Sequence, residues 1–169
     1  MPIELANPAA AELLSRARAL RITSLDAELE SYLAEGLAVQ SDGTIVSIAA
    51  LRGANTYRGR FPDRVGYEAF VNKMHLDDWC SDALARAPLE EKLAHGLVLA
   101  DRVGAWAVEH DASVVVVISA DVASDDIVFR FHGVHAGEPP WLTEIETYPE
   151  PAVLRRYSPG EPEADPSEE

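Results

Sequence analysis

The sequence predicts an α+β fold, in which a mostly antiparallel sheet of about five strands packs against helices. Apolar residues recur at helical spacing over residues 88–110, which is the strongest helical signal in the chain. Residues 113–120 form a continuous apolar run of strand length, and residues 127–134 alternate between apolar and polar side chains. A chain of 169 residues usually forms one domain, and we expect residues 1–157 to do so.

The first third of the chain predicts two helices and a hairpin. An Asn-Pro pair opens the helix-forming residues 7–20, because Asn caps a helix and Pro fits its first turn. A second helix start at Thr23–Ser24 is followed by apolar residues at helical spacing, and this helix should end at Gly36. Residues 37–51 then predict two strands around a type I′ turn at Asp42–Gly43, a pair that tolerates positive φ angles.

Three further helices are expected before the apolar run. Residues 67–74 place apolar side chains on one helical stripe, and His75 follows its end. Asp77 or Asp78 can cap the short helix that comes next. The long helix over residues 88–110 carries a groove of small side chains on its apolar face, formed by Gly96, Ala100 and Gly104. A sheet or another helix should approach this groove closely.

The last part of the chain predicts three strands. The β-branched residues 113–120 suit a central strand that is buried on both faces. Arg130 and His132 face one side of the strand over residues 127–134, opposite to its three apolar side chains. A proline indicates that the final strand, over residues 151–157, starts there or lies at a sheet edge.

The chain is strongly acidic. Its 29 Asp and Glu residues against 14 Lys and Arg give a formal net charge of −15. We therefore expect no nucleic-acid partner, because sequence-independent binding requires basic residues that neutralise phosphates. Residues 158–169 contain five acids, three prolines and no base, which predicts a disordered tail. The remaining residues still carry −10, which predicts at least one continuous negative surface.

We expect a cytoplasmic protein without membrane partners or cofactors. No apolar run reaches the roughly 18 residues of a membrane span, and the N-terminus lacks the basic and apolar regions of a secretory signal. The single cysteine, Cys80, excludes an internal disulfide and a cysteine-based zinc site. Neither a P-loop nor a dinucleotide-binding glycine motif is present, so no cofactor is predicted.

The histidines form two patterns that resemble metal-binding spacings. His132 and His135 are three residues apart, which places them on opposite faces of a strand. His75 precedes two aspartates that are more simply explained as a helix cap. We therefore predict no metal site, and expect a polar strand end and a capped helix instead. His95 and His110 fall on the outer side of the long helix, where we expect solvent exposure.

Catalytic motifs are scarce, which favours a non-enzymatic function. The chain has neither a G-x-S-x-G elbow nor a Ser-x-x-Lys motif, and Cys80 lies where a buried, inert thiol is expected. If the protein is an enzyme, the candidate catalytic residues are His75, Arg130 and His132. In that case arginines would hold an anionic substrate while His75 or His132 moves protons.

Two features are candidate ligand-binding elements. Arg52, Arg58, Arg60 and Arg64 give the segment over residues 52–64 a charge of +3, and a guanidinium suits a carboxylate or a phosphate. The alternative is that these arginines pair with the surplus acids of the same chain. Trp141, in a loop rich in Pro and Gly, is a candidate binding anchor, and the alternative is that it closes one end of the core.

Residues 114–142 combine an apolar strand, an acidic turn, an F-R-F-H strand and a P-x-W-L loop. In this combination the chain resembles small acidic immunity proteins that are encoded beside bacterial toxins. The resemblance implies a cytoplasmic inhibitor that caps a basic toxin domain, and it assigns no functional residue. A bacterial origin also fits the composition, with twelve arginines and only two lysines.

Two hypotheses follow. The first is a small acidic bacterial protein that binds and neutralises a basic protein partner, with its acidic surface speeding association. The second is an enzyme or binding protein for a small anionic ligand, which uses the arginine-rich segment together with Arg130 and His132. The sequence leaves the oligomeric state open.

Overall fold

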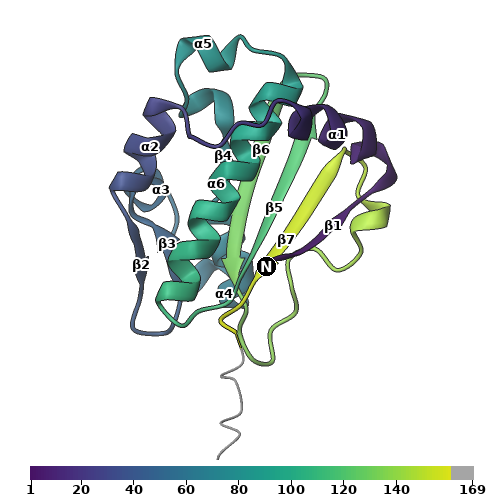
Figure 1. The fold of residues 1–169 in the computed structure, drawn as a ribbon. Helices are drawn as coiled ribbons and strands as arrows, with labels where there is room; N and C mark the ends of the chain where they lie inside the picture. Colours follow the sequence, from purple (N-terminus) through teal and green to yellow (C-terminus); the bar gives the residue numbers. More distant parts are fainter. Residues whose placement is uncertain (161–169) are drawn as a thin grey trace, which may run out of the picture.

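A computed structural model describes residues 1–160 of the chain, so residues 161–169 of the predicted tail lie outside the described part. It confirms the α+β fold: five antiparallel strands form one sheet in the order β1-β7-β5-β6-β4, and β2 pairs with β3 in a second, two-stranded sheet (Figure 1). The strands are β1 (Ile3–Ala6), β2 (Leu37–Val39), β3 (Ile45–Ser47), β4 (Met74–His75), β5 (Val114–Asp121), β6 (Asp126–Gly133) and β7 (Ala152–Tyr157).

The α-helices are α1 (Ala11–Ala19), α2 (Ala27–Ala34), α3 (Ile48–Gly53), α4 (Arg64–Val71), α5 (Asp82–Ala85) and α6 (Leu89–Glu109). Four 3-10 turns complete the fold: η1 (Pro8–Ala10), η2 (Arg58–Arg60), η3 (Leu76–Asp78) and η4 (Ile145–Thr147). Helix α6 crosses one face of the sheet with α1 packed beside it, and α4 packs on β6 from the opposite face (Figure 1). No helix within residues 1–160 has both the length and the apolar character of a membrane span.

Helix α6 confirms the strongest prediction, including its groove of small side chains. A side chain added at Gly96 would meet Ile118 and Ile127 of the sheet. At Gly104 an added Cβ would overlap the ring of Tyr157 on β7. The groove therefore lets the helix backbone lie close to the sheet. The apolar side chains of α6 on either side of the groove pack against the sheet and form part of the main core.

The central strands also follow the prediction. β5 lies between β7 and β6, and its first seven residues are buried. On β6, Phe129 and Phe131 belong to the core beneath α6. Arg130 faces the other way, because its guanidinium donates a hydrogen bond to the carbonyl of Ala69 on α4. The alternating pattern of β6 thus separates an apolar face from a polar one.

Several predicted elements differ from the structure. β1 was not expected, since four residues at a sheet edge carry little pattern. The second strand predicted within residues 37–51 ends at Ser47, whose hydroxyl caps the unexpected helix α3 by accepting a hydrogen bond from Ala50 N. The hairpin turn is not type I′, because only Gly43, with φ of 84°, has a positive φ.

Two helix caps also differ from the predicted ones. The residue that caps α2 is Asp26, not Thr23 or Ser24, and its carboxylate accepts a hydrogen bond from Glu28 N. Ser81, not Asp77 or Asp78, caps α5. In both cases the predicted and observed caps lie within four residues of each other and are all of capping type, so the sequence alone could not distinguish between them.

Two buried polar side chains, Glu68 on α4 and Asn72 directly after its end, hold β3 against β6. Glu68 accepts hydrogen bonds from Ile45 N at 2.6 Å and from Gly133 N at 2.7 Å. Asn72 accepts from Ser47 N at 2.9 Å and donates to the carbonyls of Ile45 and Phe131. β3 and β6 form no ladder with each other, so these side chains supply the partners that a sheet would otherwise provide.

Candidate functional site

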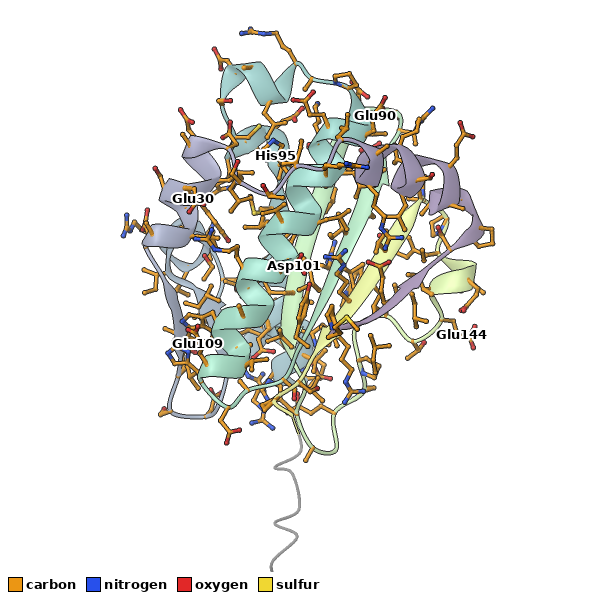
Figure 2. All side chains as sticks on the ribbon, in the orientation of Figure 1. Glu30, Glu90, His95, Asp101, Glu109 and Glu144 are labelled. Atoms are coloured by element: carbon orange, nitrogen blue, oxygen red, sulfur yellow. The ribbon has the colours of Figure 1, made fainter. Side chains whose placement is uncertain are left out.

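One end of the molecule, where the β5–β6 turn meets η3, α5 and the start of α6, gathers eight carboxylates, and we call it the acidic end. Its members are Asp77, Asp78, Asp82, Glu90, Glu91, Asp121, Asp125 and Asp126. Figure 2 shows Glu90 at this end of α6 and Glu109 at the other. Local structure favours acids here: Glu90 and Glu91 lie in the first turn of α6, and Asp121 accepts hydrogen bonds from Ala123 N and Ser124 N.

A buried lysine pairs with one of the two carboxylates in the inner layer of the acidic end. Lys92, 1% exposed, places its Nζ 3.0 Å from the carboxylate of Asp77 and 2.6 Å from the carbonyl of Asp125. Asp126 accepts hydrogen bonds from the backbone of Asp77 and Ile127. Burial raises the pKa of Asp77, with a further contribution from Asp126 and opposition from Lys92. These contacts fix η3 and the β5–β6 turn to α6.

The outer layer has no such compensation. Asp78, Glu90, Glu91, Asp121 and Asp125 form no ion pair with any residue in the described range 1–160. The remaining outer acid, Asp82, lies 3.9 Å from Arg86, and both side chains are largely exposed. Such a pair contributes little, so the surface of the acidic end stays strongly negative.

The side chains of the acidic end are better suited to electrostatic attraction than to metal binding or nucleophilic chemistry. Across residues 1–160, no group of three or more His, Cys, Asp or Glu side chains is arranged to hold a metal ion. Burial, with Asp77 close by, raises the pKa of Cys80 to about 11. The thiol is therefore protonated at neutral pH and is a poor nucleophile. The arrangement is suited to attracting cationic groups at a distance.

The candidate catalytic residues share one face of the sheet but occupy three separate environments. His75 is paired with Val128 in the β4–β6 ladder, four residues from His132, which corresponds to about 13 Å along a strand. His75 Nδ1 lies 3.1 Å from the carboxylate of Asp126. His132, 1% exposed, uses Nδ1 toward the carbonyl of Gly133. Their catalytic role stays a prediction.

Arg130 and Trp141 are brought together. The guanidinium of Arg130 lies over the Trp141 ring, 3.8 Å from its centroid, and Tyr148 packs edge-on against the same indole. Arg130 forms no ion pair with an acid within residues 1–160, and burial lowers its pKa. Trp141 therefore covers a desolvated arginine on the polar face of the sheet.

The four arginines of residues 52–64 do not converge on one point. Arg52 pairs with Glu35 at 2.6 Å, Arg58 approaches Asp42 at 3.7 Å, and Arg64 pairs with Glu138 at 2.7 Å. The fourth, Arg60, lies over the ring of Tyr57. The internal pairing considered as an alternative is thus present for three of them. A ligand-binding role for these arginines stays a prediction.

The sequence did not single out two buried charged residues: Lys92 beneath the acidic end, and Glu68 between β3 and β6. Lys92 flanks the apolar stripe of α6, three residues after Leu89, and that position was the available signal for its burial. Glu68 is fully buried and lies 2.9 Å from Nε2 of His135. No sequence pattern marks Glu68, because its partners come from segments distant in the chain.

Burial disfavours the charged form of two histidines, which makes stability depend on pH. His95 is half-buried, contrary to the expected exposure, because Asp26 N donates a hydrogen bond to its Nδ1 at 3.2 Å. Burial lowers the pKa of both His95 and His132. The unfolded chain therefore binds protons first as the pH falls through about 6.5, and stability is lost below that pH.

We expect the free energy of unfolding to fall between pH 7 and pH 5, and the variant His95→Gln/His132→Gln to show a shallower fall. Urea unfolding at several pH values measures both slopes. Glu68 opposes the trend, since burial raises its pKa, but it contributes equally to both proteins. The variant His110→Gln is the control, because His110 is exposed. If the free energy of unfolding depends equally on pH in the double variant and the parent, His95 and His132 do not cause the pH dependence.

Comparison with known proteins identifies one family. The model of the family described as Uncharacterized protein PM0498 family matches residues 5–159. No curated protein and no solved structure matches the chain.

Proposed function

The chain belongs to the PM0498 family, and we propose that it is a small acidic cytoplasmic bacterial protein that binds and neutralises a basic protein partner, as immunity proteins do. The observation that carries the proposal is the acidic end. Five of its carboxylates have no ion-pair partner within residues 1–160, while the layer beneath them is held in place by the buried Lys92.

This arrangement favours binding because the carboxylates are already positioned. The turn and η3 that carry Asp78 and Asp125 are fixed to α6 by hydrogen bonds, so little ordering is required when a partner arrives. Uncompensated charge on one end also steers a basic surface toward it and raises the association rate. The attraction is screened over about 8 Å at physiological ionic strength, so the rate should depend on salt.

The test is charge reversal at the acidic end. We expect Asp78→Lys/Glu90→Lys to lower the association rate constant about tenfold at low salt, because two steering charges change sign. The matched control is Glu109→Lys/Glu144→Lys, whose acids also lack ion pairs within residues 1–160 and lie away from the acidic end (Figure 2). The partner is first isolated by affinity capture from the native organism, and stopped-flow mixing then measures the rate.

Two outcomes would contradict the proposal: association that does not change with salt, or equal losses in the reversed pair and its control. A dominant loss on reversal of Arg52, Arg58, Arg60 and Arg64 would instead favour the second function, binding of a small anionic ligand. That alternative is supported by Arg130, which is desolvated against Trp141 and has no acid partner within residues 1–160.

A further inference from the structure

A cleft of about 330 Å³ opens between α2, α3, α4 and β4, and Trp79, which follows η3 of the acidic end, lines one side of it. It lies where two hydrophobic clusters meet: Tyr32, Met74 and Trp79 belong to the main core, and Val71 belongs to a smaller cluster beneath α3 and α4. Junctions between separately packed units are common places for ligand pockets.

The walls of the cleft are largely apolar and aromatic. The rings of Tyr32 and Trp79 meet edge-on, with centroids 4.9 Å apart. Phe70 is 57% exposed, which is unusual for a large aromatic side chain, whereas Val71 and Met74 are buried. A cavity of about 150 Å³ accommodates benzene. The cleft therefore has room for a phenylalkyl or bicyclic group.

The charge on the lining of the cleft is positive. Its lining contains Lys73 and Asn55 but neither Asp nor Glu, although the chain has 29 acids. Lys73 is exposed and forms no ion pair within residues 1–160. The hydroxyl of Tyr32 is buried beside the Ser47 side chain, which does not line the cleft. Lys73 is therefore the one charged group among the residues that line the cleft.

We propose that this cleft binds a small carboxylate with a flat apolar body. The apolar body packs between Trp79 and Phe70, and the carboxylate pairs with the ammonium of Lys73. The charge of the cleft selects an anion over a cation, and its shape selects an aromatic ring over a short acid. None of the eight carboxylates of the acidic end lines this cleft, so its ligand binding can be tested independently of the protein-binding function.

Three probes of matched shape test the proposal: 3-phenylpropanoate, 3-phenylpropan-1-ol and 3-phenylpropylamine. Binding is followed through the indole N–H signal of Trp79 in two-dimensional NMR, which is assigned with Trp79→Phe. We expect saturable shifts of this signal, with the carboxylate binding at least about threefold more tightly than the alcohol and the amine most weakly. In Lys73→Met the carboxylate and the alcohol should bind equally.

The control variant is Arg60→Met, which removes another cation without an acid partner within residues 1–160, and it should leave the threefold preference intact. The proposal is overturned if the three probes bind equally to the parent protein, or if none binds. It is also overturned if the shifts appear only at Trp106 or Trp141, or if Lys73→Met keeps the preference for the carboxylate.

Discussion

Replacing Glu68 with methionine is expected to lower the free energy of unfolding by roughly 3–5 kcal/mol, because the loss of one buried partner leaves several donors unsatisfied. Glu68 is fully buried, accepts hydrogen bonds from Ile45 N and Gly133 N, and lies 2.9 Å from Nε2 of His135. Methionine fills a similar volume but accepts none of these bonds effectively. Urea unfolding of the two proteins measures the difference.

The matched control is Glu28→Met, since Glu28 is exposed on α2 and changes of this kind usually stay within about 0.5 kcal/mol. Amide hydrogen exchange should also show which part of Glu68→Met is destabilised. Relative to the parent protein, we expect the exchange rates to rise more at Ile45 and Ser47 than in β5, because β3 depends on α4 for its hydrogen-bond partners. A loss below about 1 kcal/mol for Glu68→Met would mean that water replaces the carboxylate.

Gly104→Ala is expected to destabilise the protein by roughly 1–3 kcal/mol, although alanine is the better helix former. The added Cβ would overlap the ring of Tyr157, whose hydroxyl is held by Asp101 at 2.8 Å. Tyr157 and the neighbouring Arg155 both bind Asp101, so movement of the ring also disturbs the contact between β7 and α6. Thermal and urea unfolding both measure the effect.

Gly96→Ala provides the control on the same helix face. Its Cβ would lie 3.4 Å from Ile118 Cγ2 and 3.6 Å from Ile127 Cγ2, which is close to ordinary packing. Because alanine favours a helix by about 1 kcal/mol over glycine, this substitution should be neutral or stabilising. Equal losses at the two glycines would show that the approach of Tyr157 is not what requires glycine at position 104.

The regular elements could be predicted because their patterns are local. The stripe of α6 and the alternation of β6 each repeat over enough residues to identify the element and its buried face. β1 could not be found, because an edge strand of four residues shows no such repeat. α3 was also missed, since Ser47 ends a strand and caps a helix at the same point.

The position of the candidate site was harder to predict than the helices and strands, because it depends on which segments the topology brings together. The negative surface could be expected from the net charge, but its position could not, because Asp77 and Asp126 meet only through the pairing of β4 with β6. The same holds for Arg130 and Trp141, which the sequence singled out separately and the structure stacks. Lys92 was overlooked because a lysine beside an apolar stripe ordinarily extends into solvent.

The strand order has a consequence for how the chain reaches its native state. β1 pairs only with β7, which begins about 145 residues later, so the N-terminal strand cannot dock until nearly the whole described chain is available. β5 likewise gains its second neighbour only then. Contacts this distant in sequence slow folding, because a large loop must close before they form. During synthesis we therefore expect β1 to stay unpaired at least until β7 has emerged from the ribosome.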